Sequence, residues 1–289
     1  PPVEGRGRRA LYRRRHGRGA RCMGSAEDGT DRQTLSALVV ARNEEARLPD
    51  CLASLGFADE VVVVLDRSTD GSAAIAAAAG ARLLEGAWVL EGDRRNAGIA
   101  ACRGAWILEV DADERVPPAL AAAIRVTIAG SAFDWHQVGI DNYVGARLLR
   151  HGGAGSFGTT SKPVLFRRGA KRWGPQRVHP CLDWVGQEGP RVEGGAIVHL
   201  VDRDISDMLR RLDRYASARA ADLLAAGEIG TLPGNLRRFV SRAFKSYVAR
   251  GGWREGAWGV LLALCAGLFP LLSHLKARLE PERHGGGRA

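Results

Sequence analysis

The sequence lacks the glycine-rich phosphate loops and the cysteine spacing that define several large classes of protein. No Gly-x-Gly-x-x-Gly follows the first apolar run and no Gly-x-x-x-x-Gly-Lys-Ser/Thr occurs, which argues against dinucleotide-binding and P-loop proteins. No apolar core of the signal-peptide kind occurs near the N-terminus. The cysteines are odd in number and scattered, which favours reduced cytosolic thiols over a disulfide framework. They are Cys22, Cys51, Cys102, Cys181 and Cys265.

The positive charge of the chain is concentrated at its start. The 289 residues carry a formal net charge of +10, but residues 1–22 contain eight arginines and one glutamate, which leaves only about +3 for the rest. This stretch has almost no apolar periodicity, so we expect residues 1–33 to be a disordered basic segment. Because it precedes Met23 and the folded pattern, we expect residues 1–22 to be non-native upstream sequence. The alternative is a basic arm that binds nucleic acid or anionic lipid.

Apolar runs alternate with helical patterns between residues 35 and 129. We expect strands at 35–40, 60–65, 81–84 and 106–110, and helices at 48–55, 72–79, 93–102 and 117–129. This alternation predicts an α/β fold with a parallel sheet covered on both faces. In such sheets ligands bind beyond the carboxyl ends of the strands.

Polar clusters follow three of these strands. They are Arg42-Asn43-Glu44, Asp66-Arg67-Ser68 and Asp111-Ala112-Asp113. Loops that only turn the chain need Gly, Pro or Asn, so three charged clusters at one edge predict a polar ligand site. Arg94 and Arg95, on the helix before the last strand, are the nearest basic candidates for contacting phosphates.

The cluster at Asp111, Asp113 and Glu114 places three carboxylates within four positions. They repel one another unless a cation lies among them, and hard oxygen ligands of this kind suit Mg²⁺ or Mn²⁺ that bridges to substrate phosphates. The alternative is a solvated acidic turn before the helix that Pro117 and Pro118 open.

The second half of the chain is less regular. Residues 133–200 are rich in glycine and aromatic residues, with short extended runs. We expect an irregular, partly antiparallel half that shapes the pocket of a second substrate. A helical pattern follows from Asp204 to Ala226. The sequence therefore suggests a main domain at 34–200 and a helical C-terminal region at 201–280.

The C-terminal region contains a basic segment followed by an uncharged one. Six basic residues lie between Arg237 and Arg254, and the next eighteen residues, 256–273, carry no charge. That length borders on a membrane span. We expect a helix that lies in, or dips into, the cytoplasmic face of a membrane, in preference to a full span. A buried C-terminal helix is the alternative.

Three successive stretches resemble the signatures of family 2 glycosyltransferases. They are Val39–Glu45, Val63–Gly71 and Leu108–Arg115, in that order. The lipopolysaccharide-core β-glucosyltransferase-like branch is the most similar, and later stretches that include Arg150-His151 and Val178-His179 also resemble it. The resemblance covers about residues 35–280.

The resemblance implies a GT-A fold, in which a Rossmann-like, mostly parallel sheet is flanked by helices. It implies an inverting enzyme that moves a sugar from a UDP- or GDP-sugar to a hydroxyl of a glycan or lipid-linked acceptor, for cell-envelope synthesis. Such an enzyme is cytoplasmic, peripheral on the inner face of the cytoplasmic membrane, and has no nucleic-acid partner. By match, Mg²⁺ or Mn²⁺ is held by Asp111 and Asp113, with Asp113 as the direct ligand. The matched donor-binding residues are Ala41, Asn43, Glu44, Asp66, Arg95 and Asp111.

The chain departs from the family pattern in two places. Leu65 replaces an acidic residue and Arg67 replaces a glycine, which affects the role of Asp66. His179 precedes a proline where the branch often has glutamate, so the obvious carboxylate base is missing. Asp183 and His179 are our candidates for the catalytic base, with Glu188 and Asp141 as substitutes. A sugar-nucleotide nucleotidyltransferase is the alternative function, although it normally has a glycine-rich loop after the first strand.

Overall fold

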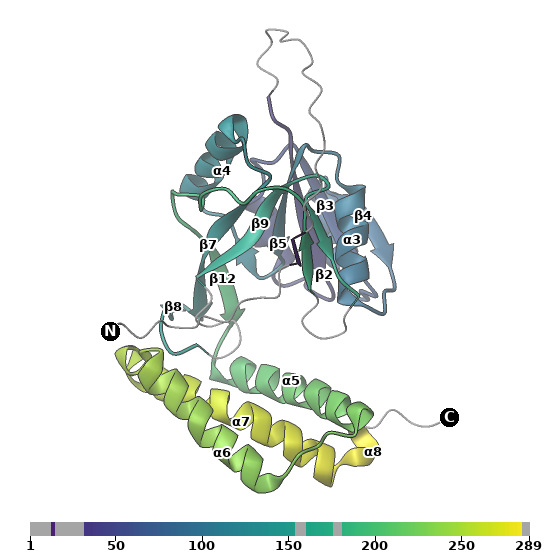
Figure 1. The fold of residues 1–289 in the computed structure, drawn as a ribbon. Helices are drawn as coiled ribbons and strands as arrows, with labels where there is room; N and C mark the ends of the chain where they lie inside the picture. Colours follow the sequence, from purple (N-terminus) through teal and green to yellow (C-terminus); the bar gives the residue numbers. More distant parts are fainter. Residues whose placement is uncertain (1–12, 15–31, 154–159, 176–180, 285–289) are drawn as a thin grey trace. The chain divides into compact units, whose positions relative to one another are not determined.

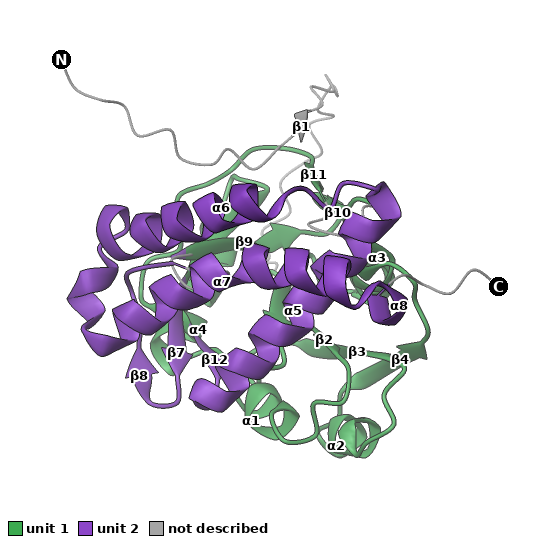
Figure 2. Cartoon of the chain, turned by 90° about the horizontal axis from the view of Figure 1, so that it is seen from below, with its two compact units in different colours: residues 1–139, 161–197 green, residues 140–160, 198–289 purple. Residues whose placement is uncertain are grey.

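The computed structural model describes residues 13–14, 32–153, 160–175 and 181–284, and the chain divides into two compact units (Figure 2). Unit 1 combines Pro1–Gly139 with Ser161–Ile197, and unit 2 combines Ile140–Thr160 with Val198–Ala289. Residues 140–160 thus group with the C-terminal helices. Most of the basic segment 1–33 lies outside the described residues. Its described part includes the short strand β1 (Arg13–Arg14).

Unit 1 is built on four parallel strands that confirm the predicted alternation (Figure 1). Their spatial order is β4-β3-β2-β5, so the first of them along the chain is flanked on both sides. The winding therefore reverses between β2 and β5, which creates a topological switch point where ligands of open α/β sheets bind. The strands are β2 (Leu35–Ala41), β3 (Glu60–Asp66), β4 (Arg82–Gly86) and β5 (Trp106–Asp111).

Helix α3 approaches the sheet closely because it has a glycine where it crosses the strands. A Cβ at Gly98 would lie 2.6 Å from Leu38 and 2.8 Å from Val64, so only glycine fits there without displacement. This packing brings the two arginines of α3 towards the strand ends. The helices of unit 1 are α1 (Leu48–Ala53), α2 (Ser72–Ala78), α3 (Glu91–Ala101) and α4 (Pro118–Gly130).

Antiparallel strands extend the sheet, as predicted for the irregular half. β9 pairs antiparallel with β5, β7 pairs with β9, and the order continues through β12 to β6, with β8 paired to β7. β1, β11 and β10 form a separate small sheet. The bounds are β6 (Glu114–Arg115), β7 (Trp135–Val144), β8 (Arg147–Leu148), β9 (Ser161–Arg167), β10 (Lys171–Trp173), β11 (Leu182–Trp184) and β12 (Ala196–Asp202).

Unit 2 contains three long helices, with α7 between α5 and α6 (Figure 2). Asp204 caps α5 by accepting a hydrogen bond from the N–H of Asp207. Met208, Leu262 and Cys265 lie in the core. The elements are α5 (Ile205–Ala226), α6 (Leu232–Phe244), a π-helix (Lys245–Ala249), a 3-10 helix (Gly252–Glu255), α7 (Ala257–Leu279) and α8 (Pro281–His284).

The uncharged stretch 256–273 forms most of α7. Within the described part of the chain, α7 is long and apolar enough to cross a membrane, but 39% of its apolar window is buried inside the protein. A core helix passes the same test of length and composition, so α7 alone is weak evidence for a membrane span.

Candidate active site at the carboxyl ends of the strands

The three polar clusters lie along one edge of the sheet, as the sequence predicted. In the register of the parallel strands, Val40 lies opposite Asp111, and Ala41 lies opposite Leu65. Asp66 ends β3, and β2 lies between β3 and β5. Two strand spacings, roughly 10 Å, therefore separate the strand ends that carry Asp66 and Asp111. The edge is therefore narrow enough for one extended polar ligand to contact all three loops.

The loops after β2 and β3 are joined by hydrogen bonds. The Asn43 side-chain oxygen accepts the Thr69 N–H at 2.8 Å, and the Asn43 N–H donates to Ser68 Oγ at 3.2 Å. The Glu44 N–H donates to Ser72 Oγ at 3.0 Å. Asn43 has a φ of 55°, in the left-handed region that asparagine tolerates better than most residues. These contacts fix the shape of this part of the edge.

Arg67 adopts a left-handed conformation, with a φ of 52°, at the position where the resembled signature has glycine. Its Nε and Nη2 donate to the two oxygens of Asp66 at 2.9 and 3.0 Å, and Nη2 also donates to the Trp88 carbonyl. Such a backbone costs about 1 kcal/mol or more in a non-glycine residue. The side-chain contacts of Arg67 offset that cost.

Asp66 is buried but remains a strong acid. Burial raises its pKa, but hydrogen bonds from Arg67 and the Trp88 N–H, together with the charges of Arg67 and Arg94, outweigh burial and hold the pKa below its usual value. Asp66 is thus a fixed, ionised acceptor at the end of β3.

Asp66→Asn is expected to lower the free energy of unfolding by about 1–3 kcal/mol at pH 7, because charge-assisted hydrogen bonds are lost. The folded-state pKa is below the ordinary 3.8, so this stabilisation is present above that value and is lost as the pH falls through the folded-state pKa. Urea unfolding of both proteins at pH 7 and pH 3 checks this. An equal difference at both pH values would contradict the assignment.

Lys162 of β9 lies among the carboxylates of the acidic turn. Its Nζ is 3.3 Å from Asp111 Oδ2 and 2.5 Å from Glu114 Oε1, while Glu114 Oε2 accepts the Asp111 N–H at 3.0 Å. Burial lowers the pKa of Lys162, but the two carboxylates outweigh it and raise the pKa. We expected a cation at this place, and the protein itself supplies one. No local sequence pattern links this lysine to Glu114, which lies 48 positions away.

Asp111 is held on its other side by Arg95. Nη2 of Arg95 donates to Asp111 Oδ1 at 3.0 Å, Nε donates to Glu91 at 3.0 Å, and the guanidinium lies over the Trp173 ring. Arg95 therefore reaches the acidic turn, and its contact with a donor diphosphate stays a prediction. Its neighbour Arg94 contacts Asp66, so adjacent residues of α3 connect to two of the three polar clusters.

A second buried ion pair supports this arrangement. Glu109, two residues before Asp111 on β5, is buried and pairs with the buried Lys171 of β10. Glu109 also accepts a hydrogen bond from Trp173 Nε1 at 3.1 Å and lies 3.7 Å from Arg95. Sequence analysis missed this pair. The charged residue within an otherwise apolar strand was the feature that could have indicated it.

Asp113 is the second carboxylate of the acidic turn. Its carboxylate lies 3.5 Å from Arg47 Nη1, and about a quarter of the side chain is exposed. Among the described residues, no group of three or more His, Cys, Asp or Glu side chains is arranged to hold a metal ion. Two carboxylates on one partly exposed turn nevertheless suit Mg²⁺ or Mn²⁺, because these ions commonly take one or two carboxylates and complete their coordination with substrate phosphates and water.

None of the contacts described above for the turn of Asp111 and Asp113 involves a candidate catalytic base. His179 lies outside the described residues. Asp183 is exposed on β11, and its neighbour on the strand, Trp184, faces the core instead. Glu188 belongs to unit 1 and Asp141 to unit 2. The assignment of the base to Asp183 or His179 stays a prediction.

The strand order defines an α/β protein with polar clusters at the switch point of its sheet. The family described as Glycosyl transferase family 2 matches residues 36–183, more than half of the chain. The chain therefore belongs to glycosyl transferase family 2: it is a glycosyltransferase, with the GT-A fold that the resemblance implied.

Other known proteins are similar over different lengths. A protein of Rhizobium meliloti named lipopolysaccharide core biosynthesis glycosyltransferase LpsC is 27% identical over 84% of this chain and 91% of its own. An uncharacterized glycosyltransferase of Rickettsia bellii is 33% identical over 35% of this chain and 34% of its own.

Among solved structures, glucosyl-3-phosphoglycerate synthase from Mycobacterium tuberculosis, crystallised with Mn²⁺, UDP and glucosyl-3-phosphoglycerate, is 23% identical. The alignment covers 39% of this chain and 45% of that one, so this chain spans less than half of its length. The TM-score of 0.32 is too low to support a conclusion about this protein.

Proposed function

We propose that this protein transfers a sugar from a nucleoside diphosphate sugar to a hydroxyl of a glycan or lipid-linked acceptor of the cell envelope. The observation that carries the proposal is the turn of Asp111 and Asp113 at the switch point, beside the interlocked loops of Asn43 and Asp66. The relative named for lipopolysaccharide core biosynthesis, which matches most of this chain, supports an envelope acceptor.

The donor lies along the edge of the sheet in this proposal. Its base and ribose lie at Ala41, Asn43, Glu44 and Asp66, where Asp66 offers a fixed carboxylate as a hydrogen-bond acceptor. Its diphosphate lies at Arg95 and at the acidic turn. A bound divalent cation neutralises the negative charge that develops on the diphosphate as the sugar–phosphate bond breaks.

The residues around Asp111 have a positioning role. Arg95 and Lys162 each hold one oxygen of Asp111, so its carboxylate keeps one orientation. Asp113, which lies 3.5 Å from Arg47 and is partly exposed, would bind the ion directly, as the family match implies. Arg95 and Lys162 also place positive charge within a few ångströms of the diphosphate, which favours its binding.

The acceptor hydroxyl loses its proton to a base in this proposal. Asp183 is the candidate carboxylate and His179 the candidate imidazole, and either takes the proton as the hydroxyl oxygen attacks the anomeric carbon. Attack from the side opposite the diphosphate inverts that carbon in a single displacement. The acceptor is membrane-associated and the enzyme works at the cytoplasmic face.

A panel of UDP- and GDP-sugars, assayed with and without Mn²⁺, tests the proposed function. We expect one donor to release nucleoside diphosphate, and the release to depend on the metal. Release of pyrophosphate from a sugar phosphate and a nucleoside triphosphate would indicate the nucleotidyltransferase instead. Donor turnover unchanged by a chelator would contradict the metal assignment.

A further inference from the structure

Helix α6 of unit 2 carries a row of exposed apolar side chains. Leu232, Leu236, Val240 and Phe244 are 44%, 47%, 64% and 62% exposed, and they recur at every fourth position. Val248, four residues further on, is also about half exposed. Single exposed leucines are ordinary on protein surfaces, but four large apolar side chains at this spacing form a row along α6, which Val248 continues on the π-helix that follows. We call these five residues the apolar stripe.

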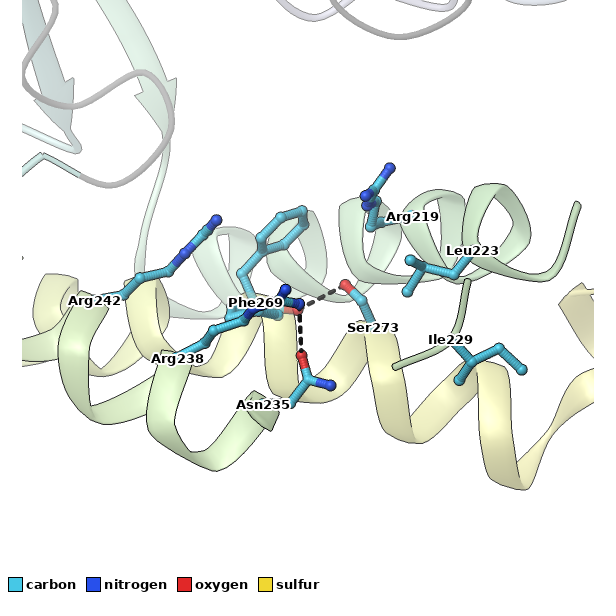
Figure 3. A pocket seen from close by; sticks show the side chains of 9 residues that line it. Arg219, Leu223, Ile229, Asn235, Arg238, Arg242, Phe269 and Ser273 are labelled. Carbon is cyan, nitrogen blue, oxygen red and sulfur yellow. Dashed lines mark hydrogen bonds between the residues drawn. The ribbon is translucent and has the colours of Figure 1, made fainter. Parts of the chain in front are cut away.

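The other sides of α6 face parts of unit 2. Phe239 packs against Gly267 of α7. Arg238 and Arg242 line a cavity of about 310 Å³ together with Phe269 of α7 and Arg219 of α5 (Figure 3).

The stripe and the cavity lie on opposite sides of α6. Arg238 and Arg242 each follow a stripe residue by two positions, which is about 200° around a helix. The stripe therefore points away from the cavity. Because neither α7 nor the cavity covers it, the stripe is the solvent-facing apolar side of α6.

The stripe lies in a segment with charge of one sign. Residues 229–254 contain six arginines and lysines and no aspartate or glutamate. Arg237 and Lys245 are the immediate neighbours of two stripe residues. Trp253 is 56% exposed just beyond the stripe, and aromatic residues of this kind favour the boundary between hydrocarbon and water.

We propose that the apolar stripe of α6 docks this protein on the surface of an anionic lipid bilayer, with the helix lying in the plane of the interface. In such an arrangement the apolar side chains enter the hydrocarbon of the bilayer, and the basic residues beside them contact the anionic headgroups. Self-association through the same face would bring two segments of six positive charges together, which opposes a second copy as the occupant.

This proposal changes which element contacts the membrane. The sequence pointed to residues 256–273, but many of those side chains pack inside unit 2, including Leu262, Cys265 and Ser273. This inference names the element that would bring the enzyme to a membrane-associated acceptor. It rests on the proposed function only for the reason why the enzyme binds a membrane. The binding test below uses neither donor nor acceptor, so its result is independent of whether sugar transfer is confirmed.

Vesicle sedimentation of the full chain tests the proposal. Vesicles of phosphatidylcholine alone are compared with vesicles that also contain phosphatidylglycerol, using wild type, Val240→Glu and Ser241→Glu. Both variants add the same charge to adjacent exposed positions, and the basic N-terminal segment is identical in all three. We expect Val240→Glu to weaken partitioning onto anionic vesicles about tenfold or more, because it removes an apolar side chain from the stripe. Ser241→Glu should change it by less than about threefold.

Equal weakening by both variants would overturn the proposal, because it would show attraction by charge alone. Absence of wild-type binding to any vesicle would overturn it as well. Circular dichroism melting verifies that the variants fold. Phe244→Gln, which changes no charge, repeats the test if Val240→Glu is unstable. Sedimentation velocity tests the other possible occupant of the stripe, a second copy of this chain. If the wild type forms a dimer that Val240→Glu dissociates, and does not bind vesicles, a second copy covers the stripe and the membrane proposal is wrong.

Discussion

Asp113→Asn is expected to lower the turnover of the nucleotide-sugar donor about a thousandfold, which corresponds to about 4 kcal/mol in the activation barrier. Asn keeps the size of the side chain but removes the charge that attracts a divalent ion. The side chain is partly exposed and its ion pair with Arg47 is long, at 3.5 Å, so the substitution should leave the fold intact. The measurement is kcat with saturating donor and Mn²⁺, together with the melting temperature.

Asp50→Asn is the matched control for this experiment. Asp50 has a largely exposed side chain on α1 and lies 3.6 Å from Arg115, so it too is a carboxylate beside an arginine. We expect its turnover to stay within about twofold of wild type. Turnover close to wild type in Asp113→Asn would remove Asp113 from the catalytic machinery.

Glu109→Leu is expected to destabilise the protein by about 3–5 kcal/mol, because it leaves the Lys171 ammonium buried without its carboxylate. Urea unfolding followed by circular dichroism measures this loss. The double variant Glu109→Leu with Lys171→Met replaces both charges by apolar side chains of similar length and should recover most of the stability.

The two variants together test whether the pair is coupled. A single variant that costs less than about 1 kcal/mol, or a double variant no more stable than the single one, would contradict a buried ion pair at this place. The activity of the double variant tests a different contact of Glu109, the one with Arg95. Since Glu109 also lies 3.7 Å from Arg95, we expect weaker donor binding even where stability is recovered.

The parallel part of the sheet and the position of the site could be predicted from the sequence because their determinants are local. Apolar runs of strand length, such as the one ending at Leu65, are followed directly by charged clusters. The rule that parallel strands end at one edge then brings the clusters together. The structure confirms this through the pairing of Val40 with Asp111.

The basic side chains that hold the acidic residues of the site could not be predicted, because they lie on strands that are distant in the sequence. Lys162 lies on β9 and Lys171 on β10, and both contact acidic residues of β5 or of the turn after it. Antiparallel pairing of β9 with β5 brings Lys162 to the acidic turn, whereas Lys171 comes from the separate small sheet, and no local pattern indicates either arrangement. The family resemblance indicated Arg95 as a site residue. Its contact with Glu91 follows from helix geometry, because the two residues are four positions apart.

The C-terminal region shows how far hydropathy alone can be used. The uncharged run was conspicuous in the sequence, yet α7 packs between two other helices. The apolar residues of α6 were inconspicuous because arginines, such as Arg237 and Arg238, stand between them. The exposed fractions of Val240 and Phe244 show that α6 presents apolar side chains to solvent.

Titration with Mn²⁺, followed by electron paramagnetic resonance, tests the central claim most directly. The experiment uses the full chain, with UDP, with GDP and without nucleotide. The account predicts that one of the two nucleotides tightens Mn²⁺ binding to the wild type by at least tenfold, because its phosphates complete the coordination begun by Asp111 and Asp113. Asp113→Asn should abolish that tightening. Equal Mn²⁺ binding by the two proteins in all three conditions would contradict the account.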